Sequence, residues 1–248
     1  MNLDRAYDFI RKKILSGEYG PGAALMTEQI SSEAGVSRTP VRDALRQLES
    51  EGLVSIRPRL GASVKQMDLK ELREMCELRL ALEGHSAQLA ALNRTEQELA
   101  DIADALKAMQ RLVDEITAGR KEDALVAELL RNDVRFHIAI MIAAKNDLMK
   151  KEIIRLHLIN RVVAGTGEAN RGERELPTKA ERDARRRQVL DSHVAIYEAI
   201  AGRDGPAAKT AMEQHIQELI EHTLRSFAQN ESARPTRELT ADELLYSA

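Results

Sequence analysis

Three histidines and one aspartate lie at positions where an amphipathic helix would bury its apolar face. Asp133 and His137 are one turn apart on a face that they share with Leu130 and Ile140, which is expected to point into the core. His193 and His215 interrupt the apolar faces of two later helices. Burying such groups without partners costs roughly several kcal/mol each, so they are expected to pair with one another, with water or with a metal. Imidazoles and a carboxylate on three helices suit a divalent transition metal, with Zn²⁺ the first choice and Ni²⁺ or Mn²⁺ the alternatives.

A simpler interpretation stays open for each of these histidines, that of a core residue with a satisfied hydrogen bond. An Asp-x-x-x-His pair on a helix is common by chance. The remaining histidines, His85, His157 and His222, have no comparable set of neighbours, and a structural role is expected for them.

One arginine also points toward the interior of the helical part of the chain. Arg79 lies among apolar positions such as Leu72 and Leu82 on the helical wheel. A guanidinium in that position needs an anionic partner. Two partners are open, the side chain of Glu83 one turn later and the carboxylate of a bound ligand.

Three arginines form a stripe on a short helix expected from Ser37 to about Gly52. The stripe consists of Arg38, Arg42 and Arg46, with Thr39 beside it. Guanidinium groups match the paired acceptors of guanine and the oxygens of phosphate, and a helix of this kind fits the major groove of DNA. The simpler interpretation is a solvated helix face.

The elements around this stripe favour DNA. Helices are expected over 3–14 and 27–34, the second capped by Thr27, before the arginine-bearing helix that Ser37 caps. Two short alternating runs, 53–56 and 62–65, then predict a β-hairpin, whose tip carries Arg59 and Gly61. This order of elements is that of a winged helix-turn-helix.

The rest of the chain predicts a mainly α protein in which an all-α antiparallel bundle follows the winged helix. Ala, Leu, Glu and Arg dominate, and apolar residues recur with helical spacing. Helices are expected over 68–92, 95–118, 121–144, 146–164, 178–202 and 205–228. A polar loop, a lid or only a linker, is expected over 165–177. The predicted domains are a DNA-binding domain (1–66), a helical effector-binding, metal-binding and dimerisation domain (67–228) and a polar C-terminal tail (229–248).

Composition narrows the class of protein. The chain has 248 residues, a formal charge of −3 and one cysteine, Cys76, so neither a disulfide framework nor a cysteine-based zinc finger is possible within it. Residues 1–65 carry ten basic and eight acidic side chains, a net of +2, which leaves −5 for the remainder. No apolar stretch approaches the length of a membrane helix, and no signal peptide is apparent. A cytoplasmic location with no membrane partner is therefore expected.

The N-terminal motif resembles a known family. SRTPVRDALRQLESEGLV, starting at Ser37, followed by PRLGASV, starting at Pro58, is similar to the DNA-binding domain of the GntR family of bacterial transcriptional regulators. The resemblance implies that Arg38 and Arg42 contact bases or phosphates. The resemblance also implies that Ser37 and Thr39 contact the DNA backbone and that Arg59 and Gly61 form the tip of the wing.

The helical part resembles the FCD domain, the ligand-binding domain of the FadR subfamily of GntR regulators. The resemblance rests on LRLALEGHSAQLAA, NDVRFHIAI, KNDLM, SHVAIYEAI and AMEQHI. It implies a metal bound by Asp133, His137, His193 and His215, and a small organic acid whose carboxylate binds Arg79. Two positions depart from the family pattern and are expected near the pocket: Lys145 stands where glycine is usual, and Ser192 where glutamate is frequent.

These features predict a transcriptional regulator, in the commoner case a repressor. A homodimer would present two winged helices to the half-sites of a palindromic double-stranded operator, and an organic acid would shift the spacing of the recognition helices. Two alternatives remain, a metal-dependent enzyme acting on a small carboxylate and a regulator whose metal is purely structural. The enzyme is disfavoured because no dedicated general base accompanies the motif and the arginine stripe would be left unexplained.

Overall fold

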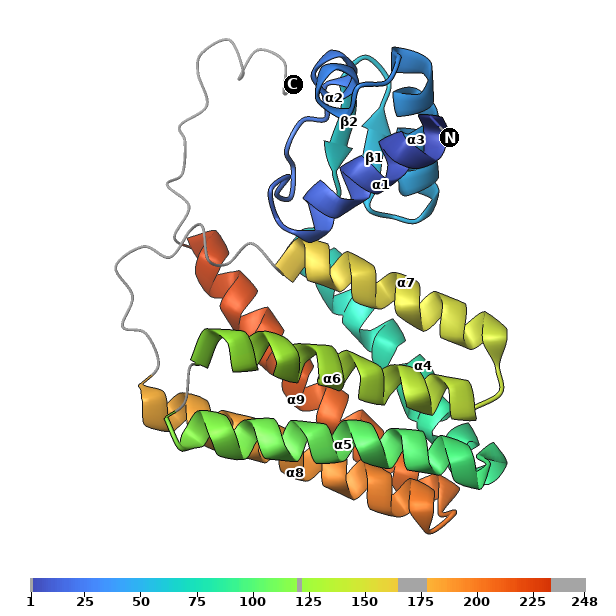
Figure 1. The fold of residues 1–248 in the computed structure, drawn as a ribbon, viewed down its shortest axis with the longest axis vertical. Helices are drawn as coiled ribbons and strands as arrows, with labels where there is room; N and C mark the ends of the chain where they lie inside the picture. Colours follow the sequence, from blue (N-terminus) through green and yellow to red (C-terminus); the bar gives the residue numbers. More distant parts are fainter. Residues whose placement is uncertain (1, 120–121, 165–177, 233–248) are drawn as a thin grey trace.

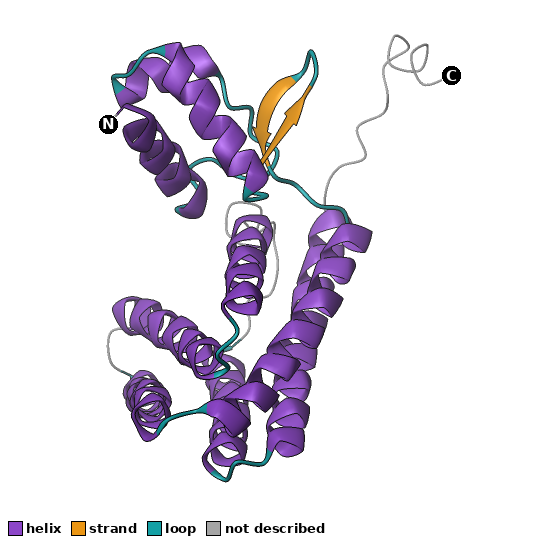
Figure 2. Ribbon diagram, turned by 90° about the vertical axis from the view of Figure 1, so that its right-hand side faces the viewer, coloured by secondary structure: helices purple, strands orange, loops and turns teal. Residues whose placement is uncertain are grey.

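The computed structural model of the chain describes residues 2–119, 122–164 and 178–232. Figure 1 shows a small N-terminal domain above a larger domain made of long helices. The strands of the described residues form a two-stranded sheet, and Figure 2 shows this sheet projecting from the N-terminal domain. The mainly α architecture predicted from the sequence is confirmed.

The N-terminal domain has the predicted order of elements. It consists of α1 (Asn2–Leu15), α2 (Thr27–Ala34), α3 (Arg38–Ser50), β1 (Val54–Arg57) and β2 (Gly61–Val64). The two strands pair antiparallel, with Val54 opposite Val64 and Arg57 opposite Gly61. The apolar face of α3 packs inward through Val41, Leu45 and Leu48, which are all buried, so the opposite face of this helix is free for solvent or a ligand.

The predicted helix caps of this domain are only partly correct. Met26 and not Thr27 occupies the N-cap of α2, because Thr27 is already the first helical residue. Ser37 does occupy the N-cap of α3, but its side chain makes no capping hydrogen bond there. The hydroxyl of Ser37 is therefore not committed to the helix that it precedes.

Six helices of the described part of the chain belong to the second domain. They are α4 (Leu69–Asn93), α5 (Glu96–Thr117), α6 (Glu122–Ala143), α7 (Asp147–Ala164), α8 (Lys179–Ala201) and α9 (Gly205–Ser232). Their bounds agree with the sequence prediction within one residue, except that α9 continues four residues beyond the predicted end at 228. Capping boxes fix three of their starts, at Asp68, Thr95 and Thr178.

The helices pack in pairs around a common interior. α4 lies along α9, α5 lies along α6, and α8 contacts both α9 and α5 (Figure 1). Arg94, which directly follows α4, connects this helix with α8. Its buried guanidinium donates hydrogen bonds to the carbonyl oxygens of Ile200 and Ala201 at the end of α8. α6 has one side facing α5 and another facing α4, which brings side chains of α6 into the interior.

The two domains touch through α7. This helix contacts α1, and near its C-terminal end Ile159 and Arg155 approach Gly52 at the end of the arginine-bearing helix α3. Gly52 has a φ of 81°, which favours glycine, and a Cβ added there would lie 2.8 Å from Cδ1 of Ile159. The glycine therefore permits both the turn into the hairpin and the close approach of α7.

No helix among the described residues combines the length and the apolarity that a membrane span requires.

Gly52→Ala is expected to destabilise the protein more than Gly17→Ala. Both glycines have a φ of 81°, so both substitutions carry the cost of the left-handed backbone, roughly 1–2 kcal/mol. A Cβ on Gly17 would meet nothing within 4 Å, whereas one on Gly52 would overlap Ile159. Overpacking should add about 1–3 kcal/mol for Gly52→Ala, measured as the free energy of unfolding in urea. Equal losses in the two variants would mean that α7 does not pack against Gly52.

Candidate metal centre and nucleic-acid interface

Three buried histidines meet in the interior of the helical domain. His137 of α6, His193 of α8 and His215 of α9 are 4%, 1% and 1% exposed, and one ring nitrogen of each lies within 4.8 Å of the others. The rings of His193 and His215 are 4.4 Å apart between centroids. Three separate helices thus bring three potential ligand atoms together, and the prediction that these imidazoles point into the core is confirmed.

Hydrogen bonds fix the tautomers of two of these histidines. Nδ1 of His193 lies 2.7 Å from the carbonyl oxygen of Val189 and must carry a proton to donate to it. The hydroxyl of Ser192 donates to the same carbonyl, so its oxygen accepts from Nδ1–H of His215 at 2.9 Å. In both rings Nε2 is consequently the nitrogen with the free lone pair.

Asp133 lies at the edge of this cluster and not inside it. Its side chain is 36% exposed, so the prediction of a fully buried aspartate is wrong, although Oδ1 lies 3.2 Å from Nε2 of His193. Burial of the carboxyl raises its pKa, but the contact with His193 and the neighbouring imidazoles outweigh this and lower the pKa overall. The carboxylate is therefore ionised and available as a ligand beside the histidines.

The imidazoles of His137 and His215 are neutral at physiological pH. Burial lowers the pKa of His137 to about 4 and that of His215 to about 2. A neutral imidazole is the form that binds a metal, because protonation occupies the lone pair. The interior thus holds these side chains in the state that a ligand role requires.

Unpartnered polar atoms gather at the same place. Seven buried side-chain nitrogen or oxygen atoms of the described residues have no hydrogen-bond partner, and four of them are Nε2 of His193, Nε2 of His215, Nδ1 of His137 and Oε2 of Glu83. Buried polar atoms are normally satisfied, so a group of unsatisfied ones indicates a missing ligand. The chemistry and arrangement of this donor set fit a divalent transition metal.

A second set of polar side chains adjoins the histidines. Nε of Arg79 donates to Oε1 of Glu83 at 2.9 Å, and both residues of α4 are buried. His157 of α7 places its Nε2 3.1 Å from the same carboxylate oxygen and 3.5 Å from Nη2 of Arg79. Of the two partners left open for Arg79, Glu83 is the one the structure provides.

Glu83 was expected only as a possible partner of Arg79, and His157 was not assigned to this site at all. Burial raises the pKa of Glu83, but the hydrogen bond from His157 and the charge of Arg79 lower it to about 2, so the carboxylate is ionised. A structural role was expected for His157, but its ring lies beside the cluster, with its centroid 6.0 Å from that of the His137 ring. One feature of the sequence could have indicated this position, because His157 lies one turn after the buried Ile153 on α7.

The two departures from the family pattern have different positions. Ser192 holds His215, as described above, and so belongs to the cluster. Lys145, expected near the pocket, instead forms an ion pair with Glu98 near the start of α5. Its φ of 59° accounts for the glycine that is usual at this position, since few side chains favour that backbone conformation.

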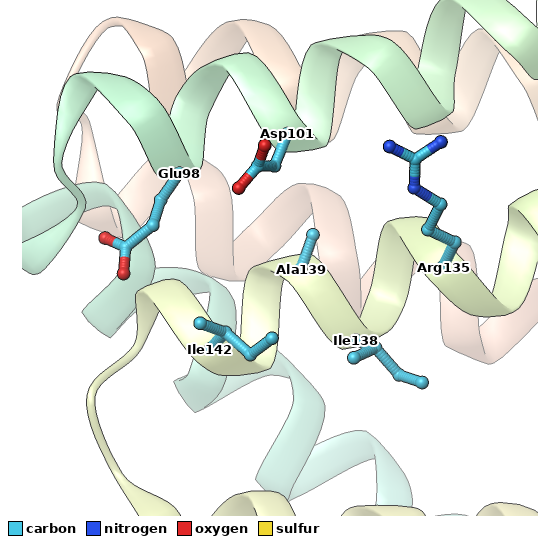
Figure 3. A pocket seen from close by; sticks show the side chains of 6 residues that line it. All are labelled: Glu98, Asp101, Arg135, Ile138, Ala139 and Ile142. Carbon is cyan, nitrogen blue, oxygen red and sulfur yellow. The ribbon is translucent and has the colours of Figure 1, made fainter.

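A surface groove between α5 and α6 is separate from the histidines. Figure 3 shows its lining side chains, which come from these two helices: Glu98, Asp101, Arg135, Ile138, Ala139 and Ile142. Next to this groove, α6 exposes several apolar side chains. Leu130, expected in the core, is 61% exposed, and Val134 is 50% exposed.

The arginine stripe lies on the exposed face of α3. Arg38 forms an ion pair with Glu28 at 3.1 Å and Arg46 lies 3.7 Å from Asp43, both in exposed surroundings where such pairs contribute little. Arg42 is exposed and forms no hydrogen bond or ion pair with the described part of the chain. Its guanidinium is therefore free to bind an external anion or base.

The remaining candidates lie at the two ends of this surface. Ser37 and Thr39 are exposed at the N-terminal end of α3. Arg59 and Gly61 lie at the turn between β1 and β2, with φ values of 67° and 86°. The helix and the wing tip thus present exposed polar residues, the arrangement that the sequence predicted. The segment 165–177, the side chain of His222 and most of the tail expected over 229–248 lie outside the described residues.

Comparison with known families agrees with both domains. Residues 2–64 match the model for bacterial regulatory proteins of the gntR family, and residues 74–218 match the FCD domain. The second match alone covers more than half of the chain.

Curated relatives match over most of their lengths. The HTH-type transcriptional regulator LutR of Bacillus subtilis is 31% identical over 219 residues, which are 82% of this chain and 92% of LutR. The HTH-type transcriptional repressor RspR of Escherichia coli is 28% identical over 91% of this chain and 90% of its own length. A probable D-xylose utilization operon transcriptional repressor of Paenarthrobacter nicotinovorans is 26% identical over 88% and 87%.

Solved structures show the same fold. McbR/YncC of E. coli superimposes with a TM-score of 0.67 at 21% identity, covering 92% of this chain and 99% of McbR. A putative GntR regulator of Rhodococcus sp. RHA1 gives a TM-score of 0.63 at 22% identity, covering 90% and 97%. Because these relatives are named as regulators, the enzyme alternative loses its basis. The chain is a member of the GntR family of bacterial DNA-binding transcriptional regulators, in the group whose second domain is an FCD domain.

Proposed function

We propose that this regulator binds a palindromic operator as a homodimer and that a small organic acid, bound at a metal site in the FCD domain, controls its affinity for DNA. The observation that carries the sensor function is the convergence of buried ring nitrogen atoms of His137, His193 and His215, with Nε2 of both His193 and His215 unpartnered. The names of two relatives as repressors favour repression. Such a regulator acts in the cytoplasm, where bacterial DNA lies.

Zn²⁺ is the metal that the donor set favours, with Ni²⁺ and Mn²⁺ as alternatives. The three histidines and Asp133 would hold it, and the ion would supply positive charge for binding a carboxylate. Val189 and Ser192 orient the rings of His193 and His215 through hydrogen bonds to Nδ1, as partners behind metal-binding histidines do. Those contacts favour a ligand role over that of three ordinary core histidines.

The buried charges set the order of binding. Glu83 neutralises Arg79, and Asp133 adds one further negative charge, so the cluster is net negative when its histidines are neutral. An incoming carboxylate would therefore meet a net negative interior, even though Arg79 is present. We infer that the acid binds only after a divalent cation has reversed the sign of this charge.

α7 is the candidate route from the sensor to DNA. His157 of this helix contacts Glu83 of the cluster, while Ile159 and Arg155 of the same helix approach Gly52 beside the recognition helix α3. A displacement of α7 by the acid would therefore reach the DNA-binding domain directly. Such control requires that the acid bind one arrangement of the domains more tightly than the other.

The exposed face of α6 is the candidate dimer surface. A symmetric interface uses the same patch on both subunits, so the patch must be self-complementary. Leu130, Val134 and Ile142 are 61%, 50% and 46% exposed along this helix. Arg135 and Asp101 lie in the adjoining groove (Figure 3), and Arg135 has no ion-pair partner among the described residues. Such a patch can place apolar side chains together and opposite charges across the two-fold axis.

A purely structural metal remains the competing interpretation of the cluster. It is favoured by the low exposure of the three histidines and predicts a DNA affinity that no small acid changes. The side chain of Asp133 is 36% exposed, which favours an accessible site instead, since a closed structural site would bury it.

Arg42→Ala is expected to weaken binding to DNA from upstream of the protein's own gene by about tenfold or more. The substitution removes an unpaired guanidinium on the recognition helix, and such contacts contribute about 1–3 kcal/mol. Binding is measured by gel shift at physiological salt, and circular dichroism checks the fold. Arg111→Ala, an exposed arginine of α5, is the matched control and should bind normally. Unchanged binding by the Arg42 variant would contradict the recognition-helix assignment.

His193→Ala is expected to lower the metal content of the purified protein, because it removes a central ligand. Metal is measured by plasma mass spectrometry, with His85→Ala, an exposed histidine of α4, as the control. Dicarboxylic, hydroxy and sugar acids should raise the melting temperature of wild-type protein loaded with metal and not that of chelator-treated protein. A full metal complement in His193→Ala would refute the ligand set, and acid binding to metal-free protein would refute the order of binding.

Val134→Glu is expected to convert the dimer to a monomer, because it places like charges opposite each other in an apolar interface. Sedimentation velocity measures the change. Met26→Glu is the control, since Met26 is 57% exposed but lies in the DNA-binding domain. A dimer that persists in Val134→Glu would place the interface elsewhere.

A further inference from the structure

Glu83 connects the two halves of the polar cluster. Its side chain is 1% exposed, and its Oε1 accepts from Nε of Arg79 at 2.9 Å and faces Nε2 of His157 at 3.1 Å. Its other oxygen, Oε2, lies 3.5 Å from Nδ1 of His137. One carboxylate therefore contacts the guanidinium, the histidine of α7 and a histidine of the candidate metal site.

The two atoms that face each other across 3.5 Å are both unsatisfied. Oε2 of Glu83 and Nδ1 of His137 are buried and have no hydrogen-bond partner. The ion pair with Arg79 favours the carboxylate form of Glu83, and the oxygens of a carboxylate can only accept hydrogen bonds. A proton on Nδ1 of His137 would satisfy both atoms and would leave the lone pair on Nε2 of that ring.

The resulting pattern repeats what the other two histidines already show. Nδ1 of His193 donates to Val189 and Nδ1 of His215 donates to Ser192, which leaves Nε2 of each as the free nitrogen. His137 is the member of the group that lacks such a partner within hydrogen-bond distance. Glu83 is the acceptor placed to complete the set.

We propose that Glu83 is a positioning residue for the metal site, which accepts the Nδ1 proton of His137 and so presents Nε2 of that ring as a ligand. This inference rests on the metal site of the proposed function. It adds a physical link between that site and Arg79, since the same carboxylate holds the guanidinium. A carboxylate behind a ligating histidine increases the basicity of the ring and fixes its orientation, and removing such a partner typically costs roughly 10–100-fold in metal affinity.

The test compares Zn²⁺ binding by full-length wild-type protein and Glu83→Gln. The apparent dissociation constant is measured by competition with a chromophoric chelator, and the melting temperature of the metal-free protein is recorded in parallel. Glu83→Gln should bind Zn²⁺ roughly 10–100-fold more weakly. The control is Glu98→Gln, which removes another largely buried, ion-paired carboxylate and should bind normally.

Absorption of bound Co²⁺ separates a positioning role from the other possibilities. The d–d bands of the Co²⁺ protein report the ligand set, so they should keep their position in Glu83→Gln while the affinity falls. Bands that move to those of a different ligand set would overturn the proposal, because Glu83 would then be a ligand itself. Zinc affinity within threefold of wild type would also overturn it, even if the metal-free protein melts at a lower temperature.

A second variant covers the case in which Glu83→Gln fails to fold because Arg79 is left unpaired. Arg79→Gln/Glu83→Gln removes both buried charges together, which avoids an isolated charge in the interior. It should show the same loss of zinc affinity, and a normal affinity would reject the role of Glu83. If wild type itself fails to bind Zn²⁺, the metal site of the proposed function is refuted together with this inference. Normal binding by the wild type and by the Glu83 variants refutes the inference alone.

Discussion

The ion pair between Arg79 and Glu83 is the interaction on which the interior of the helical domain depends. Neither charge could be buried alone, because removing one partner of such a pair leaves the other without compensation. Together they allow α4 to carry a guanidinium and a carboxylate past α6 and α7, where His137 and His157 meet them. The polar cluster is thus a connected set of contacts in which Arg79 and Glu83 compensate each other's charge.

The contacts of α7 connect this cluster with the DNA-binding domain, which is the route that we propose for control of DNA binding. α7 reaches the cluster through one side chain and the DNA-binding domain through others, and Gly52 permits the close approach at the far end. The N-terminal domain needs little else from its neighbour, because its own helices and hairpin bury the apolar face of α3. The recognition surface is therefore built independently, and its position relative to the FCD domain is what a movement of α7 would change.

Much of the fold could be predicted because it follows from local rules. The spacing of apolar residues gave all of the described helices, and the run of short alternating segments after Gly52 gave the hairpin. The errors arose where tertiary contacts decide. Leu130 matches the buried face of α6 by spacing but is 61% exposed, and Asp133 lies on the same face yet remains 36% exposed. A helical wheel gives the direction of a side chain and does not say where the neighbouring helix ends.

The sequence by itself determined the types of residue available, which are histidines and carboxylates without paired cysteines for metal, and arginines on one helix face for DNA. It determined these because residue type and helical period are local properties. The tertiary structure decided which of them meet. It brought His157 from α7 to Glu83 and gave Arg79 an internal partner where the sequence left a bound acid equally open. Those contacts join residues far apart along the chain, and only the packing of α4, α6 and α7 brings them within hydrogen-bond distance.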